Sequence, residues 1–153
     1  MTMFFRRRPA IDRDRVVRAI VAAERQTSGE IRVCVARFFW GDVRRAAEAS
    51  FARLGMTATK HRNGVLFFIV PLRRKFVVLG DEGIHAKVGP DFWTKVAAAV
   101  SDRFRARDFT GGLVQGIETV GRELASHFPY DATTDRDELP DEVDFGGKPE
   151  TGH

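Results

Sequence analysis

The sequence predicts a three-layer α/β/α sandwich with a small mixed central sheet, its elements in the order α-β-α-β-β-α-α. Three observations carry this prediction. The apolar spacing switches repeatedly between helical and strand periods along the chain. Residues 65–70 are apolar at every position, which is typical of a central strand covered on both faces. A gap of only five residues separates them from the strand at 76–79, so these two strands form an antiparallel hairpin. The length of 153 residues indicates one domain.

Each predicted helix begins at a capping residue and carries an apolar stripe at helical spacing. The first helix shows this pattern in the pairs Val16/Ile20 and Val17/Val21. The four helices are expected from Asp12 to about Gln26, after Gly41-Asp42, after Gly89-Pro90-Asp91, and from Asp108 to Phe128.

Three strands follow from the remaining apolar segments. Residues 30–38 alternate between apolar and other side chains, which indicates a strand with period two. A helix joins this strand to the one at 65–70, which makes the two strands parallel. Such a crossover connection is right-handed in nearly all known cases. The strand at 76–79 then returns antiparallel. A mixed sheet with helices on both faces results.

The charge distribution divides the chain into three parts. Residues 1–10 form a basic N-terminal segment, residues 11–128 form the α/β domain, and residues 129–153 form an acidic tail that we expect to be flexible. The tail carries a net charge of −6, whereas residues 1–128 carry +10. An alternative is that the tail folds over the basic body and masks a surface.

The basic body raises the question of a nucleic-acid or membrane partner. Its arginines are spread along the chain without interleaved aromatics, and no nucleic-acid-binding signature is present. We therefore expect a solvated basic surface and no nucleic-acid partner. The chain starts without a segment of signal-peptide type and contains no run of the roughly 20 apolar residues that a membrane span needs, so we expect a cytoplasmic protein that does not span a membrane. Cys34 is the single cysteine and excludes an intramolecular disulfide.

Strand direction brings polar residues together at one edge of the predicted sheet. Glu30 and Asn63 precede the two parallel strands, and Asp81 and Glu82 follow the antiparallel one, so all four arrive at the same edge. Carboxylate and amide oxygens are ligands suited to Ca²⁺ or Mg²⁺. A simpler alternative is that Asp81 caps a turn leading to Ile84 while Glu30 pairs with an arginine. The residues alone leave both alternatives open.

The sequence lacks the standard catalytic signatures. It contains no phosphate-binding loop, no nucleophile elbow and no zinc-protease motif. Cys34 lies in a predicted strand and is expected to be an inert packing residue. The candidates for catalysis are Asp81 and, four residues later, His85 as its acid/base partner.

Five short segments together resemble the TPM domain family. Their order and spacing are more specific than any one of them, and the similarity covers roughly residues 10–128. The segments are Thr27-Ser-Gly-Glu-Ile31, Arg62-Asn-Gly-Val-Leu66, Gly80-Asp-Glu-Gly-Ile84, Phe92-Trp93, and Phe104-Arg followed by Phe109-Thr-Gly-Gly-Leu113.

The resemblance implies an α/β/α sandwich with an acidic cleft. Members of the family include thylakoid-lumen proteins of photosystem repair credited with acid phosphatase activity, a nematode modulator of a neurotransmitter receptor, and bacterial proteins that bind calcium. Carried over by matching motif, the resemblance assigns Glu30, Asn63, Asp81, Glu82 and Asp108 to the metal site.

Two functions remain in competition at this point. The first is a Ca²⁺-binding or Mg²⁺-binding module that assists the assembly or maintenance of a membrane-protein complex, and the absence of a catalytic constellation favours it. The second is a weak acid phosphatase in which a metal ion polarises the phosphoryl group of a phosphomonoester.

Overall fold

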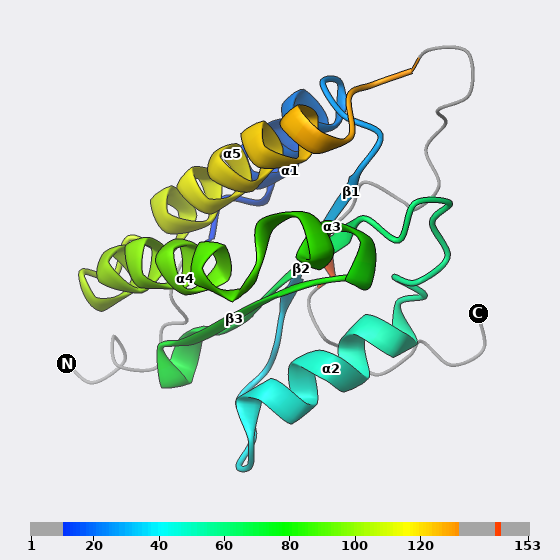
Figure 1. Ribbon diagram of the computed structural model, residues 1–153. Helices are drawn as coiled ribbons and strands as arrows, with labels where there is room; N and C mark the ends of the chain where they lie inside the picture. The colour runs from blue at the N-terminus through cyan, green and yellow to red at the C-terminus, as the bar shows by residue number, and fades with distance from the viewer. Residues whose placement is uncertain (1–10, 132–142, 145–153) are drawn as a thin grey trace, which may run out of the picture.

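A computed structural model describes residues 11–131 and 143–144 and shows the predicted sandwich (Figure 1). Four strands form one mixed sheet in the order β3-β2-β1-β4. Strand β1 (Glu30–Val35) is parallel to β2 (Gly64–Val70), and β3 (Lys75–Gly80) returns antiparallel to β2 through the short 3-10 helix η2 (Pro71–Arg73). The prediction of a parallel pair followed by a hairpin is confirmed.

In the described part of the chain, five α-helices surround the sheet. Helices α1 (Arg13–Glu24), α4 (Pro90–Arg105) and α5 (Phe109–His127) cover one face, and α2 (Val43–Arg53) covers the other (Figure 1). The short helix α3 (Glu82–Val88) follows β3 directly. Among residues 11–131 and 143–144, no helix is both long and apolar enough to cross a bilayer.

The two faces of the sheet enclose two apolar clusters. Side chains of odd-numbered residues of β1 and β2, such as Val33 and Phe67, pack under α1, α4 and α5. Their even-numbered neighbours, such as Leu66 and Phe68, pack under α2 together with Cys34. Every residue of β2 is buried, which is why this strand reads as continuously apolar.

Besides the 3-10 helix η2, the described residues contain two elements that the sequence did not predict. The first is α3, where a short turn from Asp81 to Ile84 was one of two alternatives and no helix was expected. The second is β4 (Val143–Asp144), which lies in the acidic tail and pairs parallel to β1. Val143 is buried in the larger cluster, so part of this segment contributes to the core. The expected flexibility of the tail otherwise concerns residues outside the described ranges.

Replacement of Phe67 tests the central position of β2. The side chain is fully buried, and its ring centroid lies 5.9 Å from that of Phe76. We expect Phe67→Ala to lower the free energy of unfolding by about 3–5 kcal/mol in urea titrations, because it leaves a cavity in the core. Trp40→Ala is the matched control, since Trp40 is 86% exposed, and should change it by no more than about 0.5 kcal/mol. Equal losses in the two variants would contradict this assignment of the core.

Candidate functional site

Three loop segments meet at the edge of the sheet where β1 and β2 begin and β3 ends. Backbone hydrogen bonds join them: the N–H of Glu30 donates to the carbonyl oxygen of Asn63 at 3.4 Å, and the N–H of Asp81 donates to that of Gly64 at 2.9 Å. The structure thus brings Glu30, Asn63 and Asp81 to one edge, as strand direction predicted. We call this group, with Arg62 and Glu82, the edge cluster.

Helix α3 is held against the loop before β2 by its first turn. The N–H of Gly83 donates to the carbonyl oxygen of Arg62 at 2.8 Å. A β-carbon at Gly83 would collide with the carbonyl oxygens of His61 and Arg62, so this close approach requires glycine. The glycines around Asp81 therefore permit contact between backbones at this edge.

Arg62 is the central side chain of the edge cluster. Its Nε donates to Oδ2 of Asp81 at 2.7 Å, and its Nη2 donates to Oδ1 of Asp81 at 2.9 Å. Its Nη1 also donates to Oε2 of Glu82 at 3.1 Å. The hydrogen bond to Asp81 is the largest cause that raises the pKa of the Arg62 guanidinium above its ordinary value. One arginine therefore neutralises both neighbouring carboxylates.

The backbone of Arg62 is adapted to this role. Its φ of 52° lies in the left-handed region, which a residue with a side chain rarely adopts. In this conformation its carbonyl oxygen binds the first turn of α3 while its guanidinium binds Asp81. Sequence reasoning missed this residue as a partner of Asp81, although Arg62 precedes Asn63 at the predicted edge.

Asp81 also caps α3. Its Oδ1 accepts a hydrogen bond from the N–H of Glu82 at 2.8 Å, and its side chain is 7% exposed. The simpler alternative for Asp81, a capping role, is therefore observed, although it caps a helix rather than a turn. The arginine found in the cluster binds Asp81 and Glu82.

Asn63 contributes a buried amide to the edge cluster. The residue is 0% exposed, and its Nδ2 donates to Oγ of Ser28 at 3.2 Å. Its Oδ1 is buried and has no hydrogen-bond partner within residues 11–131 and 143–144. A buried carbonyl oxygen of this kind is costly to leave unsatisfied and is a suitable ligand for a hard cation. Glu30 beside it is 4% exposed.

Asp108 does not belong to the edge cluster. It caps the start of α5, where its Oδ1 accepts from the N–H of Gly111 at 2.9 Å and its Oδ2 accepts from Nη1 of Arg103 at 2.8 Å. The far end of α5 meets the edge cluster, because the N–H of Ser28 donates to the carbonyl oxygen of Phe128. A helix of 19 residues is about 28 Å long, so the structure places Asp108 at the opposite end of the domain.

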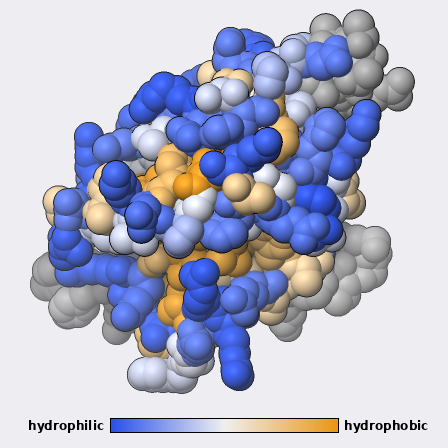
Figure 2. All heavy atoms as spheres, viewed as in Figure 1, coloured by the Kyte–Doolittle hydropathy of each residue, from blue (hydrophilic) through white to orange (hydrophobic). Residues whose placement is uncertain are grey.

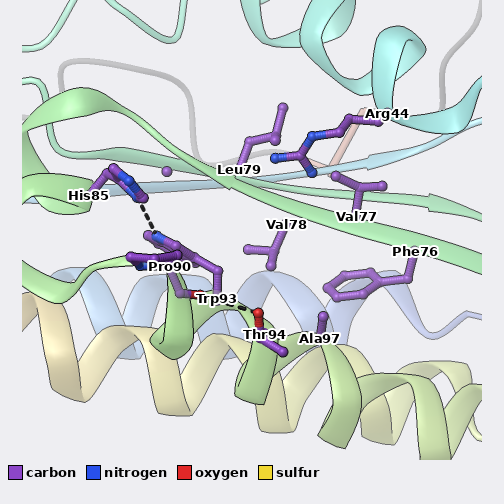
Figure 3. Close-up of a pocket in the computed structure, with 11 residues that line it drawn as sticks. Arg44, Phe76, Val77, Val78, Leu79, His85, Pro90, Trp93, Thr94 and Ala97 are labelled. Atoms are coloured by element: carbon purple, nitrogen blue, oxygen red, sulfur yellow. Dashed lines mark hydrogen bonds between the residues drawn. The ribbon is translucent and has the colours of Figure 1, made fainter.

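His85 and Asp81 bind different partners. Nδ1 of His85 accepts a hydrogen bond from Nε1 of Trp93 at 3.1 Å (Figure 3). The carboxylate of Asp81 binds Arg62 instead. His85 lines a groove of about 340 Å³ along β3, whose lining includes Gly80, the neighbour of Asp81, but no member of the edge cluster. The two catalytic candidates therefore do not form an acid/base pair in this structure.

The edge cluster combines oxygen atoms that could bind a cation with a positively charged side chain, Arg62, that already pairs with two of the carboxylates. Within the described ranges, no three His, Cys, Asp or Glu side chains are grouped so that they could hold a metal ion by themselves. The oxygens of Asn63, Asp81 and Glu82 are suitable for a hard cation, but Arg62 already binds the two carboxylates. These oxygens fit such a cation only if the Arg62 guanidinium moves away from the carboxylates of Asp81 and Glu82.

These features define a small α/β/α domain whose polar residues gather in loops at one edge of a mixed sheet. The sequence model of the TPM domain matches residues 9–123, and the chain belongs to the TPM domain family. The resemblance inferred from the short segments is thereby confirmed. No curated protein matches the chain.

Two solved structures are similar to this chain. The BA42 protein of the psychrophilic bacterium Bizionia argentinensis is 40% identical, with a TM-score of 0.81 over 88% of this chain and 92% of that protein. The N-terminal domain of the cg2496 protein of Corynebacterium glutamicum is 15% identical, with a TM-score of 0.50 over 71% of this chain and 66% of that one. The second similarity shows the fold alone.

The pH dependence of stability tests the capping role of Asp108. The hydrogen bond from Arg103, followed by that from the N–H of Gly111, lowers the pKa of Asp108. A lowered pKa in the folded state gives a stabilisation that is present above the ordinary value of about 3.9 and is lost as the pH falls through the folded pKa. Asp108→Asn should therefore be less stable than wild type at pH 7, and the difference should shrink in acid. Thermal unfolding between pH 2 and 7 measures it.

A difference that stays constant over this pH range would contradict the electrostatic explanation. Asparagine is itself a good capping residue, so the variant removes the charge and keeps a side-chain acceptor for Gly111. Asp102→Asn is the control, because Asp102 is also exposed and paired with an arginine but caps no helix.

Proposed function

We propose that this protein is a binding module whose edge cluster takes up a divalent cation, Ca²⁺ in preference to Mg²⁺, in exchange for the Arg62 guanidinium. The observation that carries the proposal is the position of that guanidinium, which bridges the carboxylates of Asp81 and Glu82. Two carboxylates that together bind one guanidinium of charge +1 would attract a divalent cation more strongly. The buried Oδ1 of Asn63 would add a neutral oxygen ligand.

The preference for Ca²⁺ follows from the flexibility of the ligand set. Ca²⁺ accepts six to eight oxygens in irregular geometry, whereas Mg²⁺ demands a near-ideal octahedron. The carboxylates come from the start of β1 (Glu30) and the start of α3 (Asp81 and Glu82) and differ in exposure, since Glu30 is buried and the Glu82 side chain is 72% exposed. Such a set adapts more easily to the larger ion.

The proposed biological role is assistance in the assembly or maintenance of a membrane-protein complex. The support for a docking role over an enzymatic one is geometric: Asp81 and His85, the two catalytic candidates, bind different partners. The alternative activity, a metal-assisted acid phosphatase, would need a group that activates water next to the cation. The described hydrogen bonds of the Asp81 carboxylate all go to the Arg62 guanidinium and to the N–H of Glu82 at the start of α3.

Exchange between Arg62 and the cation gives a sharp test. Arg62→Gln removes the competing positive charge, so it should tighten Ca²⁺ binding by about tenfold. The same variant should make the cation-free protein less stable, because Asp81 and Glu82 lose their counter-ion. Residue-resolved NMR titration with millimolar CaCl₂ and MgCl₂ measures the binding, and the shifted amides should include those of Asn63, Asp81 and Glu82.

Two further variants complete this experiment. Asp81→Asn should abolish the Ca²⁺-dependent shifts, and Arg18→Gln, an exposed arginine of α1, should leave affinity and stability unchanged. The proposal fails if neither ion shifts amides of the edge cluster, or if Arg62→Gln weakens the binding of Ca²⁺. Turnover of an aryl phosphate that is abolished by Asp81→Asn would instead support the phosphatase.

A further inference from the structure

Strand β3 has an unpaired edge in the described part of the sheet. It is the outermost strand beyond β2, and the hydrogen bond from the N–H of Asp81 to Gly64 fixes which of its residues face β2. In an antiparallel pair the residues alternate, so Leu79 and Val77 also bond to β2. The N–H and C=O groups of the residues between them therefore point outward, namely those of Phe76, Val78 and Gly80. None of the described residues forms a hydrogen bond with these groups.

This edge lies at the floor of the groove of about 340 Å³. Figure 3 shows Arg44 of α2 on one side of β3 and Trp93 and Thr94 of α4 on the other. In Figure 2 apolar surface is visible between the two helices, in the region where β3 runs. The groove therefore combines unpaired backbone groups with an apolar lining.

The edge also lacks the usual protection against pairing. Proteins commonly place charged residues, proline or a bulge in an exposed edge strand. In β3 the charged residue is Lys75 at its first position, and residues 76–79 are apolar. The flanking helices replace that protection, since they restrict access to a slender, extended chain.

We propose that β3 binds an extended acidic and apolar segment of a partner protein, which adds to the sheet as a further strand. The three outward N–H and three outward C=O groups supply the main-chain hydrogen bonds for β-strand addition. Side chains of an added strand alternate between the two walls. Those that face α2 meet Arg44, whose Nε also lies 3.8 Å from Oε2 of the exposed Glu48, and those that face α4 meet Trp93 and Ala97.

The charge of the groove favours this partner over a second copy of the chain. Its lining includes an arginine and a histidine but no acidic residue. An approaching β3 of a second copy would bring its own Arg44 and its own flanking helices, so like charges and bulky walls would meet. An acidic segment without flanking structure has neither obstacle. The site does not depend on cation binding at the edge cluster.

The experiment uses the full chain and a synthetic hexapeptide of alternating Glu and Val with blocked ends. We expect it to bind, with NMR shifts at the amides of Phe76, Val78 and Gly80. Two peptide controls separate the contributions. A version with N-methylated backbone should bind about tenfold more weakly or not at all, because it cannot complete the hydrogen bonds. A version with Lys in place of Glu should also lose about tenfold or more.

A charge reversal on α2 supplies a matched pair of protein variants. Arg44→Glu should weaken binding of the acidic peptide by about tenfold and improve that of the lysine peptide. Arg45→Glu changes the net charge equally but lies outside the lining of the groove, and it should bind like wild type. Dispersed NMR spectra establish that both variants are folded.

Three results would overturn the proposal. The first is that the acidic peptide does not bind at millimolar concentration. The second is that Arg45→Glu weakens binding as much as Arg44→Glu, which would indicate attraction to the basic surface in general. The third is that the amides of β3 shift with protein concentration in the absence of peptide, which would identify a second copy as the occupant.

Discussion

The antiparallel return of β3 beside β2 is the constraint on which the site depends. It carries Gly80 back to the edge where β1 and β2 begin, so that Asp81 can donate its N–H to Gly64 and Gly83 can donate its N–H to Arg62. Without this return Asp81 would lie at the opposite edge from Asn63. The same pairing turns the backbone N–H and C=O groups of Phe76, Val78 and Gly80 away from β2. One hairpin therefore determines both the edge cluster and the groove.

Electrostatic balance explains the second feature of the edge cluster. The carboxylate of Asp81 is 7% exposed, and a buried charge is stable only when it is paired and hydrogen-bonded. The bidentate guanidinium of Arg62 satisfies both requirements, and it remains 40% exposed. The pair is thus accessible from solvent on the arginine side, which is the side from which a competing cation would arrive.

Much of the fold could be predicted because it is encoded locally. Capping residues such as Asp12 and Asp42 mark helix starts, and both accept the expected backbone hydrogen bonds. The positions of Glu30, Asn63 and Asp81 followed from strand direction alone. Helix α3 and strand β4 could not be predicted, since seven residues and two residues are too short to show a period, and tertiary contacts stabilise them. Asp108 was grouped with the edge cluster by motif, which carries no information on the direction in which α5 runs.

The residues between Gly80 and Trp93 connect the two surfaces of the domain. Asp81 begins α3 at the edge cluster, and His85, one turn later, lines the groove and binds Trp93. The indole of Trp93 packs so closely on Gly80 that a β-carbon there would collide with it. A rearrangement at Asp81 would thus act on α3 through its N-cap, and α3 carries one residue of the groove lining. The N–H of Asp81 is hydrogen-bonded to Gly64 at the start of β2, and that of Gly83 to Arg62 in the preceding loop. Such an effect would therefore reach the groove through the His85 side chain rather than through a shift of β3.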